Sequence, residues 1–246
     1  MNSLISLKTT IGLAACSIIA MLSACAKPGL DLAELPLPAA PKPILEAYEH
    51  KLDMAMADFS TYKSKDKRLM WYAGQQLSGS MVDNEDKKNR FFAANYATFY
   101  VEKAGGQITA YEIHTETRDK TALLEAALQE QFGKPDYFYR DPDFSARVWE
   151  RGGKFFFFDT NNTTAVMGEK TRTADLMVVS SKSPALLEWF ASGGGFSYYG
   201  DYLDERAKPE HQGKPYRYAD FFRDEEAEAK SWGQEHSRYF DEYVAE

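Results

Sequence analysis

Four consecutive phenylalanines, in the stretch KFFFFD at residues 154–159, constrain the fold of this chain more than any other feature. Successive side chains of a β-strand point to opposite faces of its sheet, so a strand with one wet face alternates apolar and polar residues. Here Phe155 and Phe157 point one way, and Phe156 and Phe158 point the other. Both faces of this strand therefore need an apolar cover, which the rest of the chain has to supply.

The segments around this strand have the pattern of an antiparallel sheet. The run SARVWER at 145–151 leads into the strand through Gly152-Gly153, and the run ADLMVVSS at 174–181 follows it. An earlier hairpin is predicted within residues 95–119, with a three-residue loop at 104–106. This register is preferred because it gathers the apolar side chains on one face. Those side chains are Ala97, Phe99, Val101, Thr109, Tyr111 and Ile113.

Helical spacing marks two further segments. The better one runs from Thr121 to Phe132 and ends at Gly133, where a left-handed C-terminal cap belongs. The other is predicted at residues 44–60, from an apolar stripe of period 3.6. Strands and helices in this order predict an α+β domain over residues 44–192, an antiparallel sheet with helices packed on its faces. We expect the helix at 121–132 to cover one face of the phenylalanine strand.

Residues 193–246 form an acidic segment that is rich in aromatic side chains. Residues 201–246 carry thirteen acids and seven bases, yet residues 196–246 hold twelve of the 35 aromatic residues. Disordered tails are poor in aromatic residues, so this segment should pack as a helical cover on the second face of the phenylalanine strand, or on a partner protein. Several of its side chains fall on one helical stripe or beside it. The candidates for that packing or partner surface are Phe221, Phe222, Trp232, Tyr239 and Tyr243.

The N-terminus has the pattern of an export signal. Lys8 precedes an apolar run from Thr9 to Ala24, which predicts a signal peptide over residues 1–24. The last residues, LSAC at 22–25, resemble the lipobox of bacterial lipoproteins, and this resemblance implies that Cys25 carries lipid and begins the mature chain. The run LAAC at 13–16 also fits the pattern, but it leaves a shorter apolar region. Residues 25–43 would then be a lipidated N-terminus and a proline-rich, extended tether.

The resemblance to lipoproteins also implies a location. Ala26 follows Cys25, whereas lipoproteins retained at the inner membrane typically carry Asp there, so the resemblance implies the outer membrane, facing the periplasm. A net charge of −8 argues against nucleic acid as a partner. With lipid on Cys25 the mature chain would have no free thiol, which excludes thiolate metal sites and cysteine nucleophiles. We expect no cofactor and no metal.

One polar constellation could carry chemistry. Glu112, His114 and Glu116 occupy alternate positions of a predicted strand, and Tyr96 lies opposite His114 in the preferred register, with Thr98 opposite Glu112. A histidine between carboxylates can bind a divalent metal or act as a base with a raised pKa. Alternating charges are also typical of the wet face of a hairpin, and this is the interpretation we favour.

These observations favour a lipid-anchored envelope protein that works by binding or as a structural module, without catalysis. One alternative is a periplasmic inhibitor or immunity-type lipoprotein, whose acidic C-terminal surface meets a basic protein partner. Another is an enzyme that uses the face of Tyr96, Glu112, His114 and Glu116.

Overall fold

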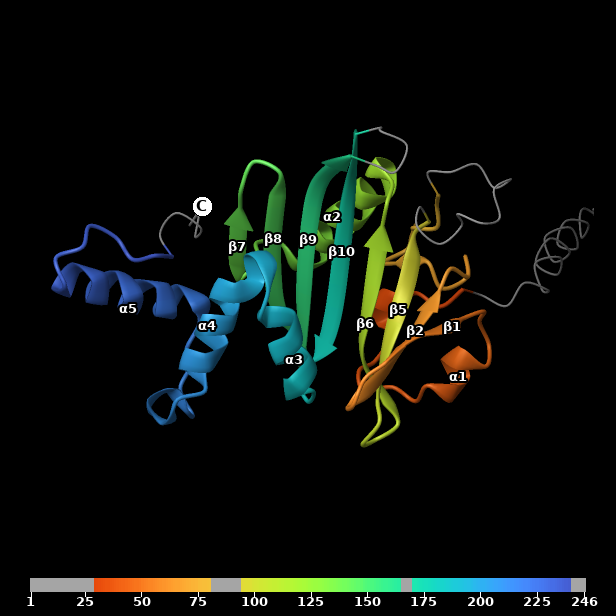
Figure 1. Ribbon diagram of the computed structural model, residues 1–246, viewed down its shortest axis with the longest axis horizontal. Helices are drawn as coiled ribbons and strands as arrows, with labels where there is room; N and C mark the ends of the chain where they lie inside the picture. The colour runs from red at the N-terminus through yellow and green to blue at the C-terminus, as the bar shows by residue number, and fades with distance from the viewer. Residues whose placement is uncertain (1–28, 81–93, 165–169, 240–246) are drawn as a thin grey trace, which may run out of the picture.

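The computed structural model describes residues 29–80, 94–164 and 170–239, and the sequence prediction of an α+β fold is confirmed. Its centre is an eight-stranded sheet with the order β1-β2-β5-β6-β10-β9-β8-β7, in which every neighbouring pair is antiparallel (Figure 1). The strands are β1 (Lys51–Ala55), β2 (Phe59–Ser64), β5 (Tyr96–Glu102), β6 (Gln107–Thr115), β7 (Tyr137–Arg140), β8 (Phe144–Arg151), β9 (Lys154–Thr164) and β10 (Lys170–Ser180).

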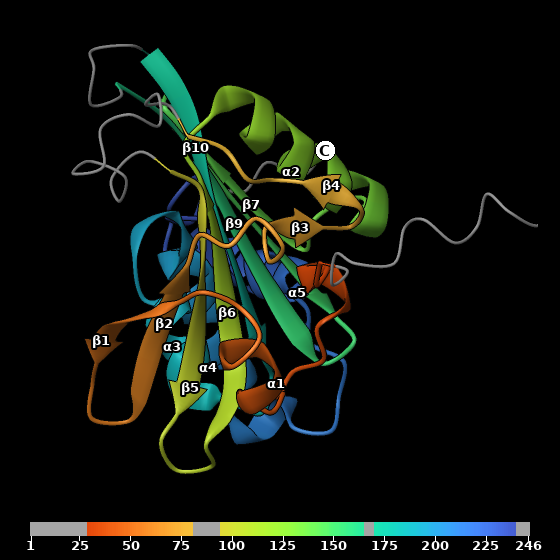
Figure 2. The same ribbon diagram turned by 90° about the vertical axis from the view of Figure 1, so that its right-hand side faces the viewer.

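Helices lie on both faces of this sheet. Figure 2 shows α2 on one side and α3 and α4 on the other, while Figure 1 shows α5 extending past the β7 edge. The helices are α1 (Lys42–Leu45), α2 (Arg118–Phe132), α3 (Pro184–Ala191), α4 (Ser197–Arg206) and α5 (Tyr218–Ser231). A small hairpin, β3 (Trp71–Tyr72) with β4 (Gln75–Gln76), lies on the α2 side.

The two faces of the phenylalanine strand face two separate apolar cores, as predicted. Phe156 and Phe158 pack in a cluster with Leu124 and Leu128 of α2. On the opposite face, Phe155 and Phe157 pack in a cluster formed largely by residues 186–239. The expectation that the C-terminal segment covers the second face within the same chain is therefore confirmed. All four phenylalanine side chains are buried.

The hairpin predicted within residues 95–119 is present as β5 and β6, and its register is confirmed over most of its length. Tyr96 lies opposite His114 and Thr98 opposite Glu112. The prediction is wrong near the turn, where Val101 lies opposite Ile108 and the register shifts after Tyr100. A bulge at Thr109 of β6 absorbs one residue there, and the loop between Glu102 and Gln107 has four residues instead of the predicted three.

The predicted helix at residues 44–60 is wrong. Only α1 is helical, and the chain continues as β1 and β2 at the edge of the sheet. Phe59 is buried and β2 pairs along β5, from Phe59 opposite Glu102 to Ser64 opposite Ala97. Hydrogen bonds to β5 and burial on the sheet outweigh the helical period of the sequence, which is a weak signal over so short a stretch.

The predicted tether at residues 25–43 is wrong for its described part, residues 29–43, which belongs to the domain. Leu32 and Leu35 are buried in the α2-side core, and the buried Tyr111 hydroxyl donates to the Leu32 carbonyl at 2.7 Å. The backbone of Ala39 pairs with that of Ile108 on β6. Proline suits such a segment as well as a tether, because both are extended and the sheet offers partners to only some of the backbone groups. Cys25 lies outside the described residues.

The Asp31 carboxylate fixes the start of this segment. Its Oδ1 accepts the Ala33 N–H at 3.0 Å and the Ala73 N–H at 2.9 Å, and its Oδ2 accepts the Gly74 N–H at 2.6 Å. Ala73 and Gly74 both have positive φ, 47° and 76°, in the tight turn between β3 and β4. One carboxylate therefore joins the N-terminal segment to the β3–β4 hairpin, and both lie over the same core.

The single helical stripe predicted along residues 222–243 is also wrong. Helix α5 ends at Ser231, and Gly233 has a φ of 76°, so the chain turns back. The Glu226 carboxylate accepts the Ser237 N–H at 2.6 Å, and this hydrogen bond holds the segment after Gly233 against α5. Tyr239 is consequently buried, whereas Trp232 is 76% exposed.

Candidate functional site

Several places in the described part of the chain gather polar side chains from different strands or helices, and three of them are candidates for a functional site. The first is on the sheet face that also carries Phe155 and Phe157, and we call it the carboxylate–histidine row. The register places Asp159 of β9 opposite Asp175 of β10, Asp175 opposite His114 of β6, and His114 opposite Tyr96 of β5. Directly opposite side chains on neighbouring strands lie on the same face about 5 Å apart. Four strands thus contribute to one transverse line.

His114 is held at both ring nitrogens. Its Nδ1 lies 2.6 Å from Asp175 Oδ1, and its Nε2 lies 3.0 Å from Glu116 Oε1. The Tyr96 ring stacks on the imidazole with a centroid distance of 4.7 Å, and Lys63 Nζ lies 4.2 Å from the centre of the Tyr96 ring. Burial of His114 lowers its pKa, but the hydrogen bonds to Asp175 and Glu116 outweigh burial and raise the pKa to about 10. His114 is therefore an imidazolium at neutral pH.

Two carboxyl groups of this site are protonated more readily than usual. Burial, together with the charge of Asp175, raises the pKa of Asp159 to about 8 and that of Glu112 to about 7. The Tyr100 hydroxyl donates to Glu112 Oε2 at 2.9 Å, which favours the ionised form but does not outweigh burial. The same burial raises the pKa of the Tyr100 and Tyr96 hydroxyls above the ordinary value, so both stay protonated.

The structure brings together the four residues that the sequence singled out, Tyr96, Glu112, His114 and Glu116. They do not form the freely solvated face that we favoured, because His114 and Glu116 are only 14% and 21% exposed at their side chains. Sequence reasoning missed Asp159 and Asp175. The aspartate that ends KFFFFD lies on the same strand face as Phe155 and Phe157, and that alternation was the available signal.

The carboxylate–histidine row is poorly arranged for metal binding or base catalysis. A histidine ligand or general base needs a ring nitrogen with a lone pair, and both nitrogens of His114 donate to carboxylates when the ring is charged. The arrangement instead holds one positive charge among several carboxyl groups, at least one of which keeps its proton near neutral pH.

The second place is a cavity of about 480 Å³ between the β7–β8 edge of the sheet and the C-terminal helices. We call it the tyrosine–arginine cavity. Its apolar walls come from tyrosine rings and a proline, and its polar lining consists of three arginines and two acids. The lining residues are Asp136, Glu150, Arg151, Tyr199, Tyr202, Arg206, Pro215, Tyr216, Arg217 and Tyr218.

Ion pairs across this cavity join the sheet to α4. Arg206 Nη1 of α4 lies 2.6 Å from Glu150 Oε2 of β8, and it also donates to the Tyr202 hydroxyl at 3.1 Å. At the sheet edge, Arg151 donates to the Asp136 carboxylate, which also accepts the Glu150 N–H at 2.8 Å. The Tyr202 hydroxyl donates to the Tyr216 carbonyl at 2.9 Å, which fixes the loop before α5.

The residues predicted as a packing or partner surface fall into different environments. Phe221 and Tyr239 are buried in the core under α4 and α5, and their ring centroids lie 5.0 Å apart. Phe222 packs on that core while partly exposed, and Trp232 points to solvent. Tyr243 lies outside the described residues. The cavity residues were missed, because no local pattern shows that Glu150 and Arg206, 56 residues apart, meet.

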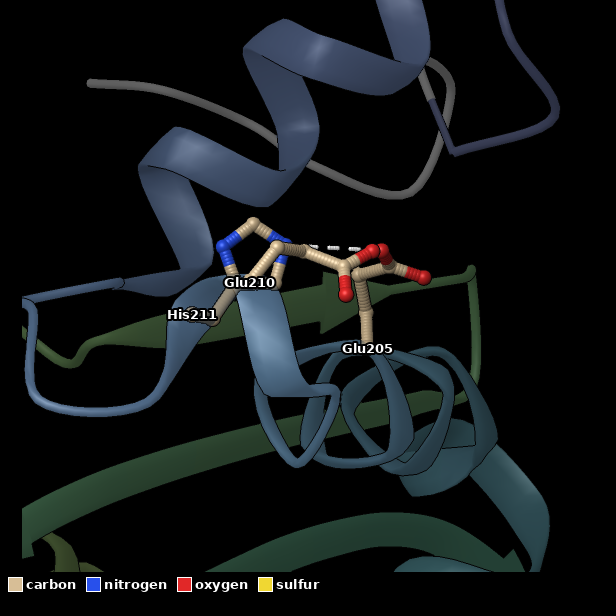
Figure 3. Close-up of side chains that lie close together, drawn as sticks. All are labelled: Glu205, Glu210 and His211. Carbon is tan, nitrogen blue, oxygen red and sulfur yellow. Dashed lines mark ion pairs between the residues drawn. The ribbon is translucent and has the colours of Figure 1, made fainter.

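A third cluster joins Glu205, Glu210 and His211, whose ligand-type atoms lie within 4.8 Å of one another (Figure 3). His211 Nε2 is 3.5 Å from Glu205 Oε1, and the imidazole stacks on Tyr216 with a centroid distance of 3.7 Å. Lys208 Nζ lies 2.5 Å from the second oxygen of Glu205. A lysine ammonium thus already neutralises the carboxylate that a metal ion would need, so we assign no metal to this cluster.

Comparison with other proteins adds nothing to these observations. Among the described residues, no helix combines the length and the apolar character needed to span a bilayer. No protein-family model, curated protein or solved structure matches this chain.

Proposed function

We propose that this protein is a non-catalytic binding module of the bacterial cell envelope, anchored by lipid on Cys25, which takes its ligand in the tyrosine–arginine cavity. The cavity is the observation that carries the proposal. Its volume of about 480 Å³ lies within the range of small-molecule sites, roughly 300–1,000 Å³. Such sites typically combine apolar walls with a few polar groups that orient the ligand.

An enzyme is the weaker alternative. The carboxylate–histidine row contains the groups that the sequence offered for catalysis, but both nitrogens of His114 are engaged by carboxylates. It is also distinct from the tyrosine–arginine cavity, since the two share no lining residue. An inhibitor or immunity-type protein remains the alternative within the binding class, and it would use the acidic C-terminal surface against a basic partner.

Ligand-observed NMR with small ring compounds tests the binding function. We expect saturation-transfer signals from compounds that enter the cavity, and the signals should weaken in Tyr216→Ala, which removes a ring from the lining. Trp232→Ala is the control, because Trp232 is exposed and is not among the cavity residues. If no compound gives a signal that responds to Tyr216→Ala, the cavity is not the binding site.

Lipidation is tested on the protein isolated from its own cells. We expect mass spectrometry of the mature N-terminal peptide to show an acylated Cys25, because the run LSAC at 22–25 resembles a lipobox. Cys25→Ser should release the protein from the membrane fraction. An unmodified Cys25, or a serine variant that still sediments with membranes, would contradict a lipid anchor on Cys25. Acylation of Cys16 would instead show that the anchor is attached there.

A further inference from the structure

We infer that the tyrosine–arginine cavity selects an anionic ligand, a ring-bearing carboxylate such as an aromatic acid or an acidic sugar. This inference rests on the proposed binding function and names the chemical class of its ligand. The charge of the lining, the hydrogen-bond donors that remain for a ligand and the position of α5 all favour a ligand of this class.

The cavity is locally basic on an acidic protein. Its lining has three arginines, Arg151, Arg206 and Arg217, against two acids, Asp136 and Glu150, whereas the whole chain has a net charge of −8. Each acid already accepts hydrogen bonds from an arginine, Asp136 from Arg151 and Glu150 from Arg206. The surplus positive charge is therefore available to a ligand, and a ligand cation would meet no unpaired acid in the lining.

Hydrogen-bond donors remain after these pairs have formed. A guanidinium group carries five N–H donors, and the ion pair of Arg206 with Glu150 uses only Nη1. Arg217 is exposed and its guanidinium forms no close ion pair within the part of the chain that the structure describes, although the Arg217 N–H and, more weakly, its charge lower the pKa of Asp220. Arginine binds carboxylates through two parallel hydrogen bonds, which makes it the side chain best suited to this recognition.

Helix α5 adds to the positive potential at the cavity. Arg217 is its N-cap residue and Tyr218 its first residue, and both line the cavity. The positive end of the dipole of this 14-residue helix therefore lies at the cavity. The Asp220 carboxylate accepts only the Arg217 N–H of the helix start, at 3.0 Å, and also pairs with Arg223, which lies outside the cavity.

The apolar walls favour a ligand that contains a ring. Tyr199, Tyr202, Tyr216 and Tyr218 come from α4, from the loop before α5 and from its first turn, and Pro215 lies beside them. Flat aromatic side chains pack on aromatic rings and on the C–H faces of sugars, and they bury either kind of ring well. Tyr199, Tyr202 and Tyr218 are at most 3% exposed, so a ligand ring would pack chiefly on Tyr216 and Pro215 while its carboxylate reaches the arginines.

Two matched pairs of probes test the inference on the purified protein by NMR titration. The pairs are 4-hydroxybenzoate with 4-hydroxybenzamide, and glucuronate with glucose. We expect the acid of at least one pair to bind about tenfold more tightly than its neutral partner, since a charge-assisted pair with arginine contributes on that scale. The pair that shows the preference identifies an aromatic or a sugar ring.

Arginine variants show whether the preference comes from this cavity. Arg217→Gln should weaken binding of the acid about tenfold and leave the neutral probe unchanged. Arg151→Gln is a second variant, and Arg223→Gln is the matched control on the same helix, since Arg223 does not line the cavity. Increasing the salt concentration should weaken binding of the acid and leave binding of the neutral probe unchanged.

The possible results separate this inference from the function on which it rests. If the acids and their neutral partners bind equally, and both lose affinity in Tyr216→Ala, the binding function is supported and the selection of an anion is wrong. If Arg217→Gln lowers the affinity for the acid and for the neutral probe by the same factor, the selection of an anion is also wrong. If no probe of either pair binds, the assignment of a ring-bearing carboxylate is wrong, and the broader screen with Tyr216→Ala decides the binding function separately.

Discussion

A chain that ends at Ser192 will not form a soluble monomer. The segment after Ser192 supplies the rings that cover Phe155 and Phe157, among them Phe196, Tyr199 and Tyr218. Burying one phenylalanine side chain contributes roughly 1.5–3 kcal/mol, and a folded domain is stable by only about 5–15 kcal/mol. The truncated chain also exposes a continuous apolar patch, which drives association. We expect insoluble protein, or soluble aggregates that bind a hydrophobic dye, in expression tests and size-exclusion chromatography.

Two single substitutions, one on α5 and one just after it, test whether buried aromatic side chains stabilise the fold without deleting any of the chain. Phe221 is 2% exposed and packs against Tyr202, Tyr218 and Tyr239. Phe221→Ala should lower the free energy of unfolding by about 3 kcal/mol or more, through lost burial and the cavity that remains. Trp232→Ala, which removes a larger but exposed ring, should change it by less than about 0.5 kcal/mol. Thermal and urea denaturation measure both.

A soluble, monomeric truncation with the stability of the whole chain would contradict this account. So would a Phe221→Ala variant as stable as Trp232→Ala. Either result would mean that the C-terminal helices do not cover the sheet, and their aromatic side chains would then be better explained as a surface for another protein.

The sequence predicted the parts of the fold that depend on local alternation. A run of four phenylalanines implies two covered faces, and the hairpin register follows from keeping Phe99 and Tyr111 on one face. Helix α2 carries its own C-terminal signal in Gly133, which has a φ of 65°. These features needed no knowledge of distant residues, and the structure confirms them.

The errors concern segments whose structure depends on distant partners. Residues 29–43 read as a tether because no local pattern shows that Leu32 will be buried beside Tyr111. Strand β2 exists because β5 offers an edge, although the sequence around Phe59 has a helical period. The sequence missed residues of both candidate sites for the same reason, since Asp159, Asp175 and the arginines of the cavity meet only through the sheet order and the path of α4.

The stability of the protein should depend on pH through the carboxylate–histidine row. Burial and the nearby charges of Asp175 and Glu112 raise the pKa of Asp159 from 3.8 to about 8. The folded state therefore holds a proton that the unfolded state has lost in this interval. A group with a raised pKa stabilises the fold fully below its unfolded pKa, and this contribution is lost as pH rises through the folded value. Stability should therefore fall between about pH 4 and pH 8.

Glu112 and His114, which lie close to Asp159, also make the folded state less stable as the pH rises. The pKa of Glu112 is raised to about 7 and that of His114 to about 10, so each also loses its stabilising proton as the pH rises. His114 faces Asp159 across β10 as a positive charge and moderates the effect without reversing it. The contribution of these three groups to the free energy of unfolding should therefore decline from pH 4 to pH 10, with Asp159 contributing the acidic half of the decline and His114 the alkaline half. Above about pH 8 the lowered pKa of Lys65 acts in the opposite direction.

Asp159→Asn should remove the contribution of Asp159, because the amide has nearly the shape of the protonated carboxyl group and carries no charge. Wild type and variant should have similar stability at pH 4, and the variant should be more stable by about 2–4 kcal/mol at pH 8–9. One pKa unit corresponds to about 1.4 kcal/mol, and we expect less than the full shift would give because Glu112 shares the same environment. Urea denaturation at each pH measures the difference.

Asp143→Asn is the matched control, because this aspartate is exposed in the turn between β7 and β8. The difference in the free energy of unfolding between Asp143→Asn and wild type should vary by no more than about 0.5 kcal/mol over this pH range. A constant difference between Asp159→Asn and wild type from pH 4 to pH 9 would show that Asp159 is ionised in the folded protein at all these values. The four carboxyl groups around His114 would then all be charged, so the attraction of His114 and Lys63 would have to outweigh burial and the repulsion among the carboxylates. If the stability advantage of Asp159→Asn over wild type were larger at pH 4 than at pH 9, the pKa of Asp159 would not be raised in the folded protein.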